Sequence, residues 1–126
     1  MPTPEQITGT FARYVDAWQR RDRDALLACF TEDVVHVDPY PSEPHVGRDG
    51  VGAFFDETVA MTDAMHFEIG RVIIGGDRGV FPFAVRSTVG GTDVEVDAVD
   101  IIEVDDDGLI RSMTAYVDMA GMRTLS

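Results

Sequence analysis

The period of the hydrophobic pattern changes after residue 59, and this change most limits what the chain can fold into. Before it, apolar residues recur every three to four positions, as on the buried face of a helix. After it, they recur every second position, as in strands with one buried face. Helices followed by a run of strands are typical of an α+β domain, in which the helices cover one face of an antiparallel sheet.

Three helices are predicted before the change. The first has Thr3 as its N-cap, Pro4 in its first turn and Gln6 completing a capping box. Asp22 and Asp49 are predicted to cap the second and third helices. The positions expected to face inward are Ile7, Phe11, Tyr14, Val15 and Trp18 in the first helix, Leu26, Leu27 and Phe30 in the second, and Val51, Phe54, Phe55 and Val59 in the third.

Strands are predicted on both sides of the third helix. One covers residues 34–38 and ends at Pro39, and residues 39–50, with three prolines and two glycines, are expected to form a loop. Four more strands are expected near residues 65–74, 79–89, 93–104 and 109–119, separated by turns at 75–77, 90–91 and 105–108. We therefore expect one domain over residues 1–126, in which three N-terminal helices cover a cone-shaped, curved antiparallel sheet around an apolar pocket.

Charge and composition exclude several classes of function. The formal net charge is −13, and all ten basic residues are arginine, so lysine Schiff-base chemistry is excluded. The acidic excess disfavours nucleic acids and anionic membrane surfaces as partners. The single cysteine, Cys29, cannot form an internal disulfide or a cysteine-based metal site, and no apolar run is long enough for a membrane helix. We expect a cytoplasmic protein that binds a small molecule.

Three polar residues stand out against the apolar pattern. Asp100 falls on the apolar face of its strand, where an ionised, unpaired carboxylate is costly, so it needs a partner, water or a raised pKa. Asp38 ends a strand just before a proline, and Tyr14 faces inward from the first helix. Each has an ordinary structural explanation when taken alone, as a strand kink, a turn or a core tyrosine. Together they are candidates for one polar site in an apolar pocket.

Other motifs do not lead to a site. A metal site built from His36, Asp38 and His45 has no matched ligand spacing to support it, so we predict no metal. The chain contains no nucleophile elbow, phosphate-binding loop or dinucleotide fingerprint. No cofactor is therefore expected.

The three polar residues and their surroundings resemble the steroid Δ-isomerases (ketosteroid isomerases) of the nuclear-transport-factor-2-like (NTF2-like), SnoaL-like superfamily. The similarity extends over nearly the whole chain. It is carried by Ala12-Arg13-Tyr14-Val15, Phe30-Thr31-Glu32-Asp33, Asp38-Pro39-Tyr40, Gly47-Arg48, Ala53-Phe54-Phe55, Phe81-Pro82-Phe83, Val99-Asp100-Ile101 and Asp107-Gly108.

The resemblance implies conversion of a Δ5-3-ketosteroid to its conjugated Δ4 isomer, without metal or coenzyme, by a homodimer. Asp38 corresponds to the general base of the family, and Tyr14 and Asp100 correspond to its two oxyanion donors. In this family the aspartic acid donor has a raised pKa and is protonated, and the resemblance implies the same for Asp100. Walls of the pocket that contact the steroid are expected at Phe54, Phe55, Phe81, Phe83, Val96, Ala98, Met113 and Val117.

Some positions depart from the family pattern. Phe30 and Phe55 stand where well-known members have tyrosines that support the oxyanion tyrosine, and Val117 stands where a large aromatic residue usually packs on the steroid. His36 replaces an apolar residue close to Asp38. The same superfamily fold also serves other functions, so two alternatives stay open: a non-catalytic binder of a steroid or other polycyclic ligand, and a polyketide cyclase.

Overall fold

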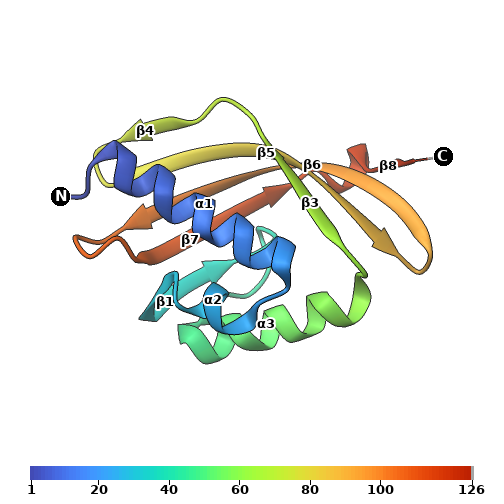
Figure 1. Ribbon diagram of the computed structural model, residues 1–126, viewed down its shortest axis with the longest axis horizontal. Coiled ribbons are helices and arrows are strands. Elements are labelled where there is room, and N and C mark those ends of the chain that lie inside the picture. Colours follow the sequence, from blue (N-terminus) through green and yellow to red (C-terminus); the bar gives the residue numbers. More distant parts are fainter. Residues whose placement is uncertain (126) are drawn as a thin grey trace.

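Figure 1 shows the computed structural model, which describes residues 1–125: helices lie across one face of a curved sheet. The sheet has eight strands in the order β2-β1-β7-β6-β5-β3, with β4 pairing with β5 and β8 with β6. The helices are α1 (Pro4–Arg20), α2 (Arg23–Leu27) and α3 (Gly47–Met61), with a 3₁₀ turn at Met119–Gly121. The strands are β1 (Phe30–Val37), β2 (His45–Val46), β3 (Met65–Ile69), β4 (Ile73–Gly75), β5 (Arg78–Val89), β6 (Thr92–Val104), β7 (Ile110–Val117) and β8 (Arg123–Thr124).

The starts of the first two helices confirm the predicted caps. The backbone N–H of Gln6 donates to Oγ1 of Thr3 at 3.1 Å, and the N–H of Thr3 donates to Oε1 of Gln6 at 2.7 Å, which closes the capping box. Asp22 accepts from the N–H of Ala25 at 3.0 Å at the start of α2. The caps satisfy backbone N–H groups at the two helix starts, as predicted.

The region between β1 and α3 differs from the predicted loop. Residues 45–46 pair with β1 as the short strand β2, and α3 begins directly afterwards at Gly47, which takes a φ of +71°. Val46 is the N-cap and makes no side-chain capping bond, so the prediction of Asp49 as the cap was wrong. Asp49 lies instead in the first turn of the helix.

The sheet is mixed and not wholly antiparallel. β1 pairs with β7 in parallel, while the other paired strands run antiparallel. β1 also begins earlier than predicted and includes Phe30, which we had expected on the second helix. The parallel pairing joins the end of β1, next to Asp38, to the strand that carries Ala115 and Val117.

The single strand predicted over residues 65–74 is two strands, β3 and β4. Both pair with β5: Ile69 lies opposite Phe83, and Ile73 lies opposite Val80. Between these two pairs, the segment that links β3 to β4 has one residue more than the facing segment of β5. That segment of β5 contains Pro82, which has no N–H to donate to a neighbouring strand. The N–H of Gly70 donates to the carbonyl of Pro82 at 2.8 Å, so the chain stays attached to β5 across the break.

The hydrophobic core lies between α1 and the inner face of the sheet. The ring of Phe11 on α1 stacks on that of Phe81 on β5, with centroids 4.0 Å apart, and Ile7, Ile102 and Ile110 are fully buried beside them. Each large apolar side chain buried in this way contributes about 1.5–3 kcal/mol to stability. This well-packed end of the sheet leaves the other end, beyond Phe83, less completely filled.

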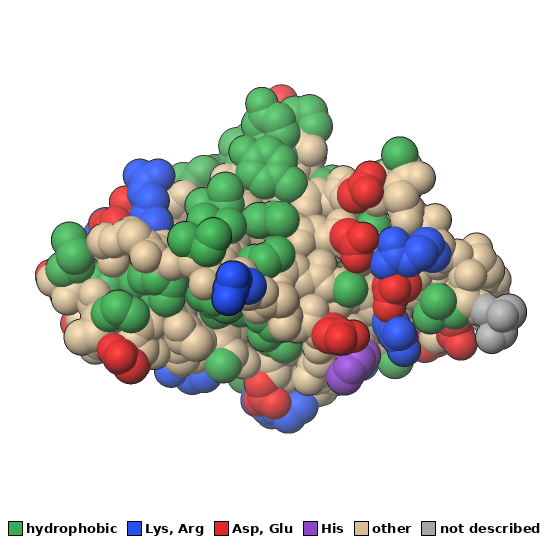
Figure 2. Space-filling view, turned by 90° about the horizontal axis from the view of Figure 1, so that it is seen from above, with side chains coloured by type: hydrophobic (Ala, Val, Ile, Leu, Met, Phe, Trp, Pro, Cys, Tyr) green, Lys and Arg blue, Asp and Glu red, His purple; other side chains and the backbone are tan. Residues whose placement is uncertain are grey.

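Charged side chains on the opposite face of the sheet form ion pairs across neighbouring strands. Arg86 of β5 and Arg123 of β8 both pair with Glu95 of β6, at 2.6 and 2.7 Å, and Arg123 also pairs with Asp97 at 3.1 Å. Figure 2, which looks from the side of β4 and β5, shows acidic and basic side chains together near the C-terminal end, while hydrophobic side chains gather toward the middle and the opposite end. No helix within residues 1–125 has the length and hydrophobicity needed to cross a membrane.

Candidate active site

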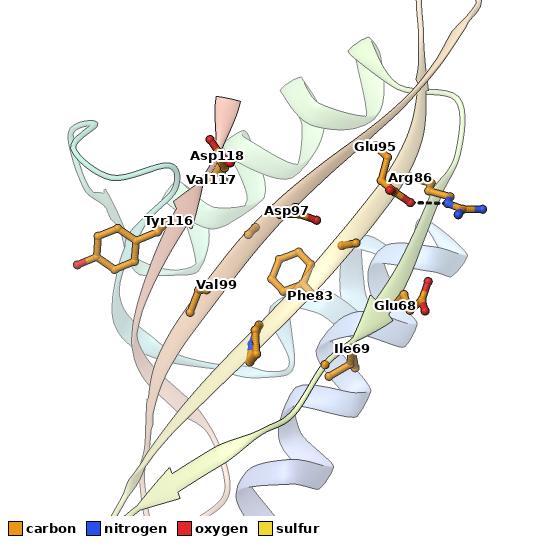
Figure 3. Close-up of a pocket in the computed structure, with 14 residues that line it drawn as sticks. Glu68, Ile69, Phe83, Arg86, Glu95, Asp97, Val99, Tyr116, Val117 and Asp118 are labelled. Atoms are coloured by element: carbon orange, nitrogen blue, oxygen red, sulfur yellow. Dashed lines mark hydrogen bonds and ion pairs between the residues drawn. The ribbon is translucent and has the colours of Figure 1, made fainter. Parts of the chain in front are cut away.

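The sheet has a hollow on each of its two faces. The outer one, about 760 Å³, is a groove over β3, β5, β6 and β7. Figure 3 shows the paired Arg86 and Glu95 at this groove, with Asp97 further along β6 and Tyr116 on the neighbouring β7. The arginines lower the pKa of Glu95, so this carboxylate stays ionised and paired. The rest of the groove lining is largely apolar, and its paired charges offer no obvious reactive group.

The inner hollow is a cavity of about 160 Å³ between the helices and the sheet. It contains the three polar residues singled out from the sequence, Tyr14, Asp38 and Asp100. The other lining residues are Trp18, Phe54, Thr58, Met65, Phe67, Phe83, Val85, Val96, Ala98, Ala115 and Val117. The cavity therefore has mostly apolar walls and a small set of polar groups, as ligand sites do.

Tyr14 reaches the cavity from the inner side of α1 and is only 3% exposed. Its ring stacks on Phe11, with centroids 5.4 Å apart, and meets the edge of Phe30 at 6.0 Å. Burial, followed by the nearby Asp100 and Asp38, raises the pKa of Tyr14 well above its usual value. The phenol therefore keeps its proton and can donate a hydrogen bond into the cavity.

Asp38 directly follows the last residue of β1 and is more exposed than Tyr14 and Asp100. Its side chain is 18% exposed, and burial raises its pKa to about 7. The sequence did not predict this raised pKa, which depends on how the folded chain buries the carboxyl. A carboxyl that titrates near neutral pH is suited to taking up and returning a proton.

Asp100 lies on β6, between Phe81 of β5 and Ala115 of β7, and is 1% exposed. Its Oδ2 is buried and has no hydrogen-bond partner among residues 1–125. Burial and, second, the charge of Asp38 raise its pKa well above the usual value. The raised pKa favours the protonated, neutral form of Asp100, which can donate a hydrogen bond to a ligand oxygen in the cavity.

The predicted pocket walls divide between the cavity and the core. Phe54, Phe83, Val96, Ala98 and Val117 line the cavity. The structure places the other three in the packed core: Phe81 beneath Phe11, Phe55 against Trp18, and Met113 at the position paired with His36. They share a strand or helix with true lining residues, so the alternating pattern could not separate the two groups.

Six lining residues were not among the predicted site residues. Trp18, Val85 and Ala115 follow the inward periodicity of their helix or strands, so the sequence pattern contained evidence for them. Phe67 and Met65 come from β3, and Thr58 comes from α3, where its hydroxyl donates to the carbonyl of Phe54 at 2.8 Å. Nothing in the linear sequence places these three beside Tyr14.

The phenylalanines at the two family tyrosine positions occupy different places. Phe30 is fully buried with its ring edge-on to Tyr14, whereas Phe55 packs against Trp18 with centroids 5.1 Å apart. Neither can extend a chain of hydroxyl groups to Tyr14. In residues 1–125, no three His, Cys, Asp or Glu side chains come together as a group that could hold a metal ion.

Comparison with known proteins agrees with this architecture. The steroid Δ-isomerase of Nocardioides simplex is 25% identical over 111 residues, which cover 88% of this chain and 89% of that protein. A second similar protein is SalBIII, an epoxide hydrolase/cyclase-like enzyme in pyran ring formation in the polyether salinomycin. Its structure superposes with a TM-score of 0.90 at 24% identity, and the match covers 99% of this chain and 100% of the SalBIII chain. The Δ5-3-ketosteroid isomerase of a Mycobacterium species superposes with a TM-score of 0.84 at 20% identity, over 95% and 98%.

The two structural likenesses confirm the α+β, NTF2-like fold with N-terminal helices on a curved sheet. The sequence similarity relates the chain, at low identity, to a steroid Δ-isomerase. The SnoaL-like domain family matches residues 11–113, a span that includes Tyr14, Asp38 and Asp100. Because this match extends over most of the chain, the protein belongs to the SnoaL-like family.

Proposed function

We propose that the protein is a cofactor-independent steroid Δ-isomerase. The observation that carries the proposal is the meeting of two carboxyls of raised pKa and a buried tyrosine in one apolar cavity. The similarity to the steroid Δ-isomerase of Nocardioides simplex supports the choice of substrate class. We expect the active form to be a homodimer, as is usual in that family.

The reaction needs one proton transfer in each direction and no redox step. The ionised Asp38 removes a proton from C4 of the Δ5-3-ketosteroid, and the electron pair moves to form a dienolate with its charge on the C3 oxygen. Tyr14 and the protonated Asp100 donate hydrogen bonds to that oxygen. Asp38 then returns the proton to C6, which gives the conjugated Δ4 ketone. Preorganised donors in a dry site stabilise such developing charge strongly.

The cavity volume sets how the substrate would sit. At about 160 Å³ the cavity is smaller than typical ligand pockets of about 300–1,000 Å³. We infer that the ketone-bearing ring enters between Tyr14 and Asp100, while the far rings extend out of the cavity past its partly exposed lining residues.

The direct test is an assay of purified protein with a β,γ-unsaturated 3-ketosteroid. The conjugated product absorbs in the ultraviolet, so we expect absorbance to rise in proportion to enzyme concentration. No rise above buffer at high enzyme concentration would contradict the proposal.

The pH dependence offers a second, more specific test. Because the pKa of Asp38 is raised to about 7, the fraction of ionised base grows as pH rises from 6 to 8. With a steroid that does not titrate in this range, we expect kcat/KM to increase with pH and reach half its maximum near pH 7. A profile that is flat from pH 5 to 9 would show that the base titrates at an ordinary value or is not used.

The same cavity supports two other functions. A non-catalytic binder would hold a phenolic steroid, an analogue of the dienolate, tightly but give no turnover. A polyketide cyclase would use the same acid and base on a polyketide; SalBIII, which has the same fold, is a cyclase-like enzyme of pyran ring formation. Comparing steroid and polyketide substrates under the same conditions separates these functions from steroid isomerisation.

A further inference from the structure

His36 is a buried histidine beside Asp38 that the steps above do not use. Its side chain is 1% exposed, and its Nε2 lies 3.9 Å from Oδ2 of Asp38. Aromatic rings surround it: its centroid is 6.0 Å from that of Phe30, 5.2 Å from that of Phe54 and 5.4 Å from that of His45. The imidazole is thus held in place by packing, with Nε2 turned toward the proposed base.

The environment of His36 determines its charge. Burial, with a smaller effect of His45, lowers the pKa of His36 to about 4, so the ring is neutral at physiological pH. A neutral imidazole carries one N–H, on either Nδ1 or Nε2.

The surroundings also favour one tautomer. The Nδ1 atom is buried and has no hydrogen-bond partner among residues 1–125. A proton there would be a buried N–H without an acceptor, which proteins avoid more strictly than an unpaired acceptor. A proton on Nε2 would instead face the carboxylate of Asp38.

We propose that His36 is a positioning residue for Asp38, whose neutral imidazole directs its Nε2–H at Oδ2 and so holds and favours the ionised carboxylate. This inference rests on the proposed function, in which Asp38 is the base. The separation of 3.9 Å is longer than a hydrogen bond, but such contacts are often long without substrate and shorten in the reactive complex. With Oδ2 held by His36, Oδ1 is left to take the proton.

Any test must distinguish the effect of His36 on the Asp38 titration from the effects of other titratable groups near this pair. Asp38 shares the cavity with Asp100 from β6 and Tyr14 from α1, and His36 is faced by His45 from β2. The neighbouring β7 places Met113 at the paired position, which does not titrate. A charge effect transmitted from His45 is therefore the main alternative to a direct contact.

The test compares wild type with three variants by ¹³C NMR of carboxyl-labelled aspartates, without substrate. His36→Leu keeps an apolar side chain of suitable size but removes the donor, so we expect the midpoint of the Asp38 titration to rise by about one pH unit. That rise reduces the ionised fraction at pH 7 from about half to about a tenth, and kcat/KM at pH 7 about fivefold. His36→Gln retains an N–H donor at a similar distance from the backbone, so it should restore most of the wild-type titration midpoint and most of the wild-type kcat/KM. His45→Gln should leave the midpoint unchanged.

Two results would overturn the inference: an Asp38 midpoint in His36→Leu equal to that of wild type, or ¹⁵N shifts that place the proton of His36 on Nδ1. The NMR readout is independent of turnover. If wild type has no isomerase activity while the Asp38 titration still depends on His36, the proposed function fails and the contact between the two side chains stands.

Discussion

Asp38→Asn is expected to nearly abolish isomerisation while leaving the fold intact. An amide cannot accept the C4 proton, and the loss of a positioned general base typically costs about 10²–10⁴-fold in rate. We expect an effect at the upper end of this range, because Asp38 is the one group proposed to carry the proton in both steps. The measurement is the rate of enone formation under saturating steroid, for variant and wild type at the same pH.

The control for this variant is its stability. Burial raises the pKa of Asp38 from its ordinary value to about 7, so between about pH 4 and 7 the folded protein binds more protons at this site than the unfolded chain does. The contribution of Asp38 to the free energy of unfolding therefore falls as pH rises through this window, and it changes no further above about pH 7. Asp38→Asn should weaken the slope and be at least as stable as wild type at pH 8.

An active Asp38→Asn variant would contradict the role of Asp38 as base. An inactive variant that is also strongly destabilised at pH 8 would contradict the account of the cavity. Burial disfavours the ionised form of Asp38, so replacing this carboxyl by a neutral amide should not weaken the fold. Unfolding in denaturant, followed at several pH values, supplies the comparison.

The sequence predicted the class of fold and the three central polar residues for different physical reasons. The capped amphipathic helix containing Tyr14 and the alternating strand containing Asp100 are local patterns, and burial of one face follows directly from them. The parallel pairing of β1 with β7 and the short strand β2 depend on segments far apart in the chain. No local period indicates them.

The candidate site was predictable only in part for a related reason. Alternation shows that Phe81 and Phe83 share a face of β5, but not that Phe11 covers the first while the second borders a cavity. The raised pKa of Asp38 likewise depends on the residues that several elements bring around it. Its Asp-Pro sequence alone suggested an ordinary turn.

Asp100 provides the second large effect, and two substitutions at this position distinguish how it works. Asp100→Ala removes the donor to the C3 oxygen and is expected to lower kcat about 10²–10³-fold, the usual loss for one oxyanion donor. Asp100→Asn keeps a neutral donor of nearly the same shape. If Asp100 works as a protonated acid, the asparagine variant should retain activity within about tenfold of wild type.

The reason for this contrast is the state of the carboxyl in the folded protein. Burial and the charge of Asp38 raise the pKa of Asp100, so the native state holds a proton that the unfolded chain releases above about pH 4. Stability of wild type should therefore decrease as pH rises toward this raised pKa, and Asp100→Asn should remove that part of the decrease. An asparagine variant as inactive as the alanine variant, yet folded, would contradict the role of Asp100 as a neutral hydrogen-bond donor to the oxyanion.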